Sequence, residues 1–253
     1  MVGPEDRALA GAVSRAQGGA RLARLGCAHR HRLLDPAAAA APSADGQRGG
    51  SCPAQKKLQR AAADERRKHP GATIEIWATD EHRIGLKPIT RGVWAPIGER
   101  PVAVGHHRFE WLYVTSFVEP ASGRTVWNVS NNICKAYFEL VLADFAKSVG
   151  AGPNKRIVLQ LDNAGWHGPE NLVVPDGIKL VFQPAHSPEL QPAEHLWAFV
   201  DEPLVNRYFE TIGDLDQVVG ERCVALMQQQ AMIRDSTLFH WLPRLKAQTA
   251  PRK

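Results

Sequence analysis

The sequence predicts an α/β protein in which helices cover a mixed β-sheet. Strand-like segments at 73–80, 110–118 and 124–130 come first, and two apolar strands at 156–162 and 178–184 then alternate with helical segments. Strands joined by a short turn pair antiparallel, whereas strands separated by a helix pair in parallel, so this order predicts both kinds of pairing. Of the 253 residues, 44% are hydrophobic and 23% are charged, which is typical of a globular protein.

The first 52 residues differ in composition from the rest. Ala, Gly and Arg account for 28 of them, and they contain no Phe, Trp, Tyr, Ile or Lys. Such a segment has too little apolar surface to offset the entropy of ordering. We therefore predict a disordered basic tail over 1–53, an exposed, charged lead-in helix over 54–72 and one folded domain over 73–253.

Charge and cysteine content exclude several classes of protein. The net charge of +5 divides into +7 for residues 1–72 and −2 for residues 73–253. No apolar run approaches the roughly 18 residues that a membrane span needs, and the N-terminus lacks the apolar core of a secretory signal. The four cysteines form no CxxC pair, which argues against a disulfide scaffold or a thiolate zinc site. We therefore expect a cytoplasmic protein without a membrane segment.

Each element of the predicted sheet has a local reason in the sequence. TIEIWATD (73–80) alternates residues that favour strands. The Gly- and Pro-containing stretch 81–109 that follows it is expected to be an extended insertion after the first strand. EWLYVTSFV (110–118) and RTVWNVS (124–130) flank the turn EPASG and predict a hairpin.

An amphipathic helix is predicted over 134–150, and Gly150 is its expected stop. Its core-facing side is expected to include Ala136, Leu140, Ala143 and Val149.

Two further helices are predicted near the C-terminus. Pro188 and Pro192 precede a helix expected at about 192–201, since proline is favoured in the first turn of a helix. A last helix is expected to run from about 214 to 233.

Three carboxylates occupy positions at which α/β sheets carry chemistry. Asp80 ends the first predicted strand, Asp162 ends a central apolar strand, and Glu194 lies in the first turn of a helix. Ligands bind beyond the carboxyl ends of strands in open α/β sheets. An all-oxygen cluster of this kind suits Mg²⁺ or Mn²⁺, and two such ions can act together on a phosphodiester.

Neighbouring polar residues allow more than one interpretation. Asn163 and His167 follow Asp162 in a polar turn, where they either orient a metal-bound group or only form hydrogen bonds within the turn. Glu81 either supports the metal ligands as a further carboxylate or is merely exposed to solvent. Because side chains alternate along a strand, Glu81 is expected to point away from Asp80, which favours exposure.

Four segments resemble a known family: WATDEHRIGLKP, RGVWAPIGERP, LQLDNAGWH and FQPAHSPELQPAEHLW. They are similar to the catalytic domain of bacterial insertion-sequence transposases of the mariner-like DDE superfamily, and the similarity covers roughly 54–243. The resemblance implies a ribonuclease H-like fold, with 73–253 as its catalytic domain. It also implies DNA cleavage and strand transfer that depend on two Mg²⁺ or Mn²⁺ ions, with Asp80, Asp162 and Glu194 as the catalytic triad and metal ligands.

The resemblance also implies partners. Its DNA substrates would be transposon ends and target DNA at the bacterial nucleoid, and a homodimer would assemble on them. Basic residues in the insertion, namely Lys87, Arg91, Arg100 and Arg108, are the candidate DNA contacts. The alternative for these residues is a solvated loop.

Residues 1–52 show no helix pattern able to build the helix-turn-helix module that relatives carry. Two other functions therefore stay open at this point. One is a transposase remnant that binds DNA non-specifically, and the other is a ribonuclease H-type nuclease.

Overall fold

The computed structural model describes residues 53–98, 101–102, 105, 108–167, 172–185 and 187–243. The expectations for the tail 1–52 and for Arg100 lie outside this part of the chain. No helix in the described ranges is long and apolar enough to cross a membrane.

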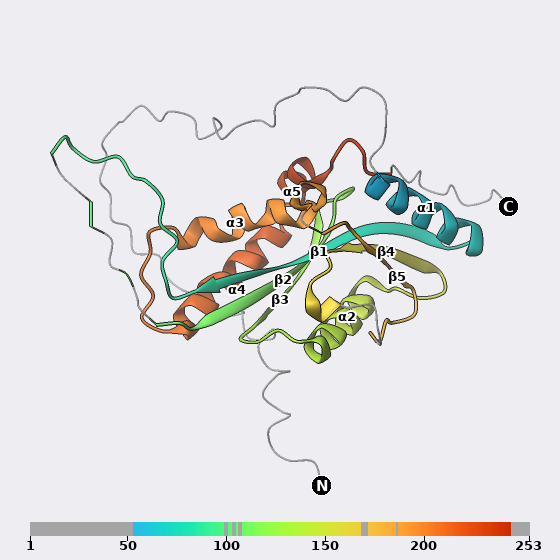
Figure 1. Ribbon diagram of the computed structural model, residues 1–253, viewed down its shortest axis with the longest axis horizontal. Helices are drawn as coiled ribbons and strands as arrows, with labels where there is room; N and C mark the ends of the chain where they lie inside the picture. Colours follow the sequence, from blue (N-terminus) through green and yellow to red (C-terminus); the bar gives the residue numbers. More distant parts are fainter. Residues whose placement is uncertain are drawn as a thin grey trace, which may run out of the picture. The chain divides into compact units, whose positions relative to one another are not determined.

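The predicted mixed sheet is confirmed, and its strands follow the order β3-β2-β1-β4-β5. β1 pairs antiparallel with β2 and parallel with β4, β2 pairs antiparallel with β3, and β4 pairs parallel with β5. This is the ribonuclease H-like arrangement (Figure 1). The strands are β1 Thr73–Gly85, β2 Trp111–Glu119, β3 Arg124–Ser130, β4 Lys155–Leu161 and β5 Ile178–Phe182.

β1 is longer than predicted, and the insertion after it is correspondingly shorter. Residues 81–85 continue the strand because they pair with β2, from Glu81 opposite Thr115 to Gly85 opposite Trp111. The pairing of β1 with β4 ends earlier, at Ala78. Asp80 therefore lies within β1 rather than at its end, just beyond the point where its neighbour β4 stops.

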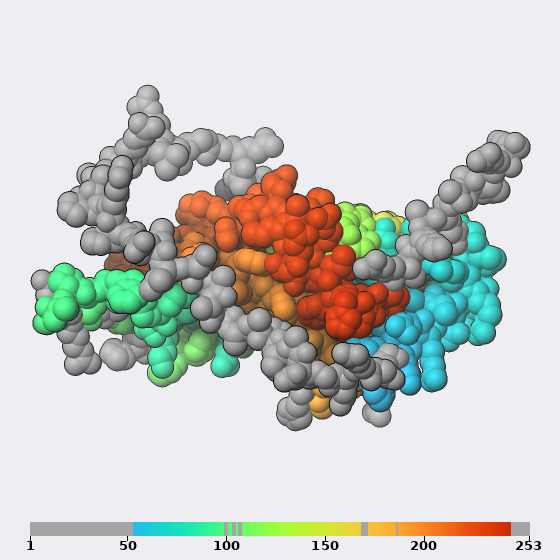
Figure 2. Space-filling model, turned by 90° about the horizontal axis from the view of Figure 1, so that it is seen from above, coloured from blue at the N-terminus to red at the C-terminus, as the bar shows by residue number. Residues whose placement is uncertain are grey.

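Helices cover both faces of the sheet (Figure 1). Ile74 and Ile76 pack with Leu58 and Ala62 of α1 on one face, and Trp77 packs against α2 on the other. The helices that complete the first face, α3 to α5, follow β5 in the chain, and Figure 2 views the molecule from this side. The α-helices are α1 Pro53–Lys68, α2 Lys135–Val149, α3 Trp197–Asp201, α4 Ile212–Met227 and α5 Gln230–Thr237.

Two helix predictions are wrong in detail. α2 buries Phe138, Leu142 and Phe145, whereas only Val149 of the four predicted residues is buried and Leu140 is 68% exposed. The helix carries apolar residues on both sides, and the side with the aromatic rings packs on the sheet. The predicted last helix is divided into α4 and α5 at a run of glutamines, 228–230, which offers no apolar side chain to the core.

Candidate active site

Asp80 is a buried carboxylate in the middle of the sheet. Its side chain is on the face covered by α3, where Trp197 Nε1 donates a hydrogen bond to Asp80 Oδ2 at 2.9 Å. The indole is held in turn by His82, whose ring stacks on it with 5.0 Å between centroids. Burial, together with repulsion from the nearby Glu194 and Glu81 carboxylates, raises the pKa of Asp80 to about 7, and the hydrogen bond from Trp197 opposes this shift.

Glu194 comes to Asp80 from a short 3₁₀ helix, Pro192–Leu196. The preceding Gln191 fixes this helix against β1, because its Nε2 donates to the backbone oxygen of Thr79 at 3.0 Å. Ala193 and Leu196 are fully buried in the core, which fixes the orientation of the helix. In this orientation Glu194 faces solvent. The like charges of Glu194 and Asp80 repel each other, as the raised pKa of Asp80 indicates.

Asp162 follows the last residue of β4 directly. Two donors hold its Oδ1 atom: the backbone N–H of Ala164 at 2.9 Å and the Nδ1 atom of His167 at 2.8 Å. The hydrogen bond with His167 is the main reason that the pKa of Asp162 is lowered. The last residue pair of β1 and β4 is Ala78 with Gln160, and Asp80 and Asp162 each lie two residues beyond it. The register of these parallel strands therefore places the backbone of Asp80 beside that of Asp162.

His167 links Asp162 to Glu81, a residue for which strand parity favoured exposure to solvent. Its Nε2 atom bonds Glu81 Oε1 at 3.0 Å, and its ring is fully buried against Phe138 of α2. Burial opposes the charged imidazole, but the two hydrogen bonds and the attraction of both carboxylates outweigh it and raise the pKa of His167 to about 9. His167 therefore joins the carboxylate of Glu81 on β1 to that of Asp162, directly after β4.

The expectation that Glu81 is exposed is wrong, because only 5% of its side chain is accessible. The parity argument itself holds, since Glu81 and Asp80 point to opposite faces. The opposite face is covered by α2 and not by water. A usable signal was present: Trp77 has the same parity as Glu81, and a buried tryptophan indicates a covered face.

Asn163 does not contact the carboxylates. Its Nδ2 atom donates to the backbone oxygen of Gln183 at 2.7 Å, which ties the end of β4 to the residue after β5. This contact joins two segments of the chain and is not a hydrogen bond within the turn.

The donor set fits a hard divalent cation. Within the described residues, neither Asp80 nor Glu194 forms an ion pair with a Lys, Arg or His side chain. Two neighbouring carboxylates without a protein cation repel each other when both are ionised. A bound Mg²⁺ or Mn²⁺ ion lowers the electrostatic cost of ionising them. Nevertheless, no three His, Cys, Asp or Glu side chains of the described part lie close enough together to hold a metal ion.

The described residues of the basic insertion run without a helix or strand (Figure 1), and most of them are exposed. Lys87, Arg91 and Arg108 are exposed, and Arg91 forms an ion pair with Glu202 at 3.0 Å. Large apolar side chains of the insertion also face solvent, including Trp94 at 92% and Ile97 at 107% of their maximal exposure.

Comparison with known proteins identifies the family. A family model described as "DDE superfamily endonuclease" matches residues 75–216, which is more than half of the chain and includes Asp80, Asp162 and Glu194. The chain belongs to this family. The resemblance inferred from the sequence motifs is thereby confirmed at the level of the DDE superfamily.

A curated relative and several solved structures are also similar to the chain. The "Uncharacterized protein y4pE/y4sA" of Sinorhizobium fredii is 37% identical over 138 residues, which is 53% of this chain and 98% of that protein. The pre-cleavage Mos1 transpososome matches with a TM-score of 0.49 and 13% identity over 78% of this chain and 66% of that chain. The catalytic domain of Mos1 mariner transposase matches with a TM-score of 0.44 and 14% identity, over 73% and 88% respectively.

The contact between Glu81 and His167 gives a testable prediction. Replacing Glu81 with glutamine removes one of the two carboxylates that stabilise the imidazolium, so the pKa of His167 is expected to fall from about 9 by about one unit or more. A pH titration of the imidazole resonances by NMR measures the shift. Glu221→Gln on α4 makes the same charge change at an exposed position and should leave this pKa unchanged. An unshifted His167 in the Glu81→Gln protein would contradict the contact.

Proposed function

We propose that this chain is an insertion-sequence transposase that cleaves DNA at the ends of its element and joins the freed 3′-hydroxyl to target DNA. The observation that carries the proposal is the pair Asp80 and Glu194, two adjacent carboxylates without a protein cation, beside the strand end that carries Asp162. The family match supports nuclease chemistry, and strand transfer is the finer part of the proposal.

Asp80, Asp162 and Glu194 are the proposed ligands of two Mg²⁺ or Mn²⁺ ions. When bound, such a pair of ions activates a water and stabilises the leaving oxygen of a phosphodiester. The residues of the chain prepare the site: Trp197 orients one oxygen of Asp80, and His167 orients one oxygen of Asp162. Both hydrogen bonds to Asp162 go to its Oδ1 atom, so its Oδ2 atom is the proposed metal-binding oxygen. Asn163 supports the site indirectly, by fixing the turn that follows β4.

The insertion is the proposed contact with DNA and with a second copy of the chain. Lys87, Arg91, Arg100 and Arg108 would contact phosphates, which bind cationic side chains without regard to sequence. The exposed Trp94 and Ile97 would be covered when a homodimer assembles on DNA, since apolar groups of this size are normally buried. The same proposal places the protein at the nucleoid in the bacterial cytoplasm, with 73–253 as its catalytic domain and 1–53 as a basic tail.

The test uses a supercoiled plasmid that carries the genomic DNA flanking the gene on both sides. The full chain is expected to nick and linearise this plasmid with Mg²⁺ or Mn²⁺, to be inactive with EDTA, and to join the cleaved ends to a second plasmid. Sequencing the junctions identifies the joined product.

The products separate this proposal from the two alternatives. Cleavage without joining would identify a nuclease of the ribonuclease H type. DNA binding without cleavage in either metal would identify a transposase remnant and would overturn the proposed activity.

A further inference from the structure

α1 presents a basic face to solvent on the side of the sheet that carries Asp80. The helix contains six Lys or Arg residues and two acidic residues, and it buries Leu58, Ala62 and Glu65. Its buried side packs against β4 and β5, of which β5 is the edge strand of the sheet. The helix occupies one end of the view in Figure 2, in blue.

A cleft of about 360 Å³ lies between α1 and β5. Side chains from one side of the helix and from the edge strand form its walls. Its charged lining residues are Lys57, Arg60, Asp64, Glu65, Lys68 and Lys179.

The two carboxylates of this cleft are neutralised by partners other than its four cations. Asp64 pairs with Arg67 at 3.0 Å, and Glu65 pairs with Arg156 at 3.2 Å. Lys57 donates to a backbone oxygen, that of Phe182, and so keeps an uncompensated charge.

In the described part of the chain, no ion pair compensates the other three cations, Arg60, Lys68 and Lys179. The cleft therefore carries an excess of about four positive charges.

One end of the cleft lies next to the candidate active site. Lys57 reaches Phe182, and the next residue, Gln183, bonds the backbone oxygen of Leu161, which precedes Asp162. The other end is at Lys68, eleven residues along the helix and therefore about 16 Å from Lys57. Cations spread over this length exceed what one isolated phosphate can contact.

From these observations we propose that the cleft between α1 and β5 binds the phosphate backbone of duplex DNA as it leaves the active site. This inference rests on the proposed function, because it assigns a second contact surface for the same DNA. The cleft is separate from the basic insertion, which begins after Gly85 at the C-terminal end of β1. Contacts of this kind position the duplex and carry no sequence information.

The test measures DNA affinity of the full chain by fluorescence anisotropy with a labelled duplex of about 30 base pairs, at about 50 to 200 mM salt. The double variant Arg60→Ala/Lys179→Ala is expected to bind about tenfold more weakly at the low-salt end. The slope of log K against log salt should fall by about 2, or about 1 for each phosphate contact removed. Both side chains are exposed, so the fold should be unaffected, which circular dichroism checks.

Lys147→Ala/Arg234→Ala is the matched control, because it removes one exposed Lys and one exposed Arg from α2 and α5. It changes the net charge equally and should leave the salt slope within about 0.5 of the wild-type value. Equal affinity of the cleft and control variants would overturn the cleft as a DNA site.

The remaining outcomes separate the cleft from the proposed function. Loss of affinity in Lys87→Ala but not in the cleft variant, with DNA cleavage by the wild-type chain, would leave the proposed function standing and remove the cleft. A wild-type chain that binds no duplex at low salt would overturn both. Preference for an RNA duplex of equal length, lost in the cleft variant, would contradict DNA as the occupant.

Discussion

Replacing Asp80 with asparagine is expected to abolish metal-dependent DNA cleavage and, at the same time, to stabilise the metal-free protein. The two effects have one cause. A carboxylate that is 9% exposed and lies near two other carboxylates is costly to ionise without a metal ion. An amide of the same shape carries no charge, still offers an oxygen to Trp197 Nε1, and is a poor ligand for Mg²⁺.

The raised pKa of Asp80 fixes the direction of the pH dependence. Its ordinary value is 3.8, and its value in the folded protein is about 7. Between these values the folded protein retains a proton that the unfolded chain releases, so the metal-free protein loses stability as the pH rises through this window. At pH 8 the asparagine variant should be more stable than the wild type by on the order of 3 kcal/mol, and near pH 4 the difference should vanish.

Urea unfolding at pH 4, 6 and 8 in EDTA measures this difference. Addition of Mg²⁺ at pH 8 should stabilise the wild type, since a ligand that binds only the folded state raises stability, and should have little effect on the variant. Asp144→Asn is the matched control, because it makes the same change at an exposed position of α2. A less stable Asp80→Asn protein at pH 8 would show that the carboxylate is not strained in the way we infer.

The fold is largely predictable because local patterns determine it. The apolar strand that follows the predicted helix 134–150 predicts parallel pairing with the first strand, and the turn EPASG predicts the hairpin. The length of β1 was not predictable, because the polar residues 81–83 resemble a loop and only their pairing with β2 makes them a strand. The buried side of α2 was ambiguous for a similar reason: contact with the sheet selects between two apolar sides of one helix.

The candidate site also has one part that is predictable from the sequence and one part that is not. Asp80, Asp162 and Glu194 are recognisable from their sequence contexts, and the family match includes all three. The contact between Glu81 and His167 depends on two segments 86 residues apart, and no local pattern encodes that distance. The ion pairs of Arg124, which join β3 to β1 and β2, were also not predictable from local sequence.

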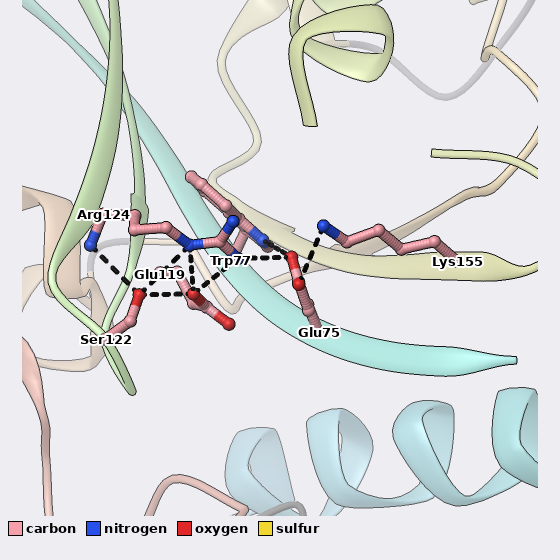
Figure 3. Close-up of polar contacts among 6 residues, drawn as sticks. All are labelled: Glu75, Trp77, Glu119, Ser122, Arg124 and Lys155. Carbon is pink, nitrogen blue, oxygen red and sulfur yellow. Dashed lines mark hydrogen bonds and ion pairs between the residues drawn. The ribbon is translucent and has the colours of Figure 1, made fainter. Parts of the chain in front are cut away.

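Arg124→Ala is expected to destabilise the protein by about 2–4 kcal/mol, because it removes a cation shared by two poorly exposed carboxylates. Arg124 lies 2.8 Å from Glu75 and 2.8 Å from Glu119, whose side chains are 13% and 10% exposed (Figure 3). Glu75 retains Lys155 at 2.9 Å in the variant, whereas Glu119 retains only the hydroxyl of Ser122. The guanidinium also covers the ring of Trp77, at 5.3 Å from its centroid, and this packing is lost as well.

The pH dependence of this effect has the opposite sign to that of Asp80. Burial tends to raise the pKa of Glu75, but hydrogen bonds from Lys155 and Trp77 and the attraction of Arg124 outweigh it, so the pKa is lowered from 4.5. A lowered pKa stabilises the folded state above the ordinary value, and this contribution is lost as the pH falls through the folded value. The loss of stability caused by Arg124→Ala should therefore be largest near pH 7 and should become smaller below about pH 4.

Urea unfolding of Arg124→Ala, Arg124→Lys and Arg234→Ala at pH 7 and pH 3.5 tests this account. The lysine variant should recover part of the lost stability, because one ammonium group keeps the charge but cannot reproduce the forked contact with two carboxylates. Arg234 pairs only with its neighbour Asp235 on the surface, so Arg234→Ala should cost about 0.5 kcal/mol or less. A deficit in Arg124→Ala that is equal at both pH values would mean that lost packing on Trp77, and not the uncompensated carboxylates, causes the destabilisation.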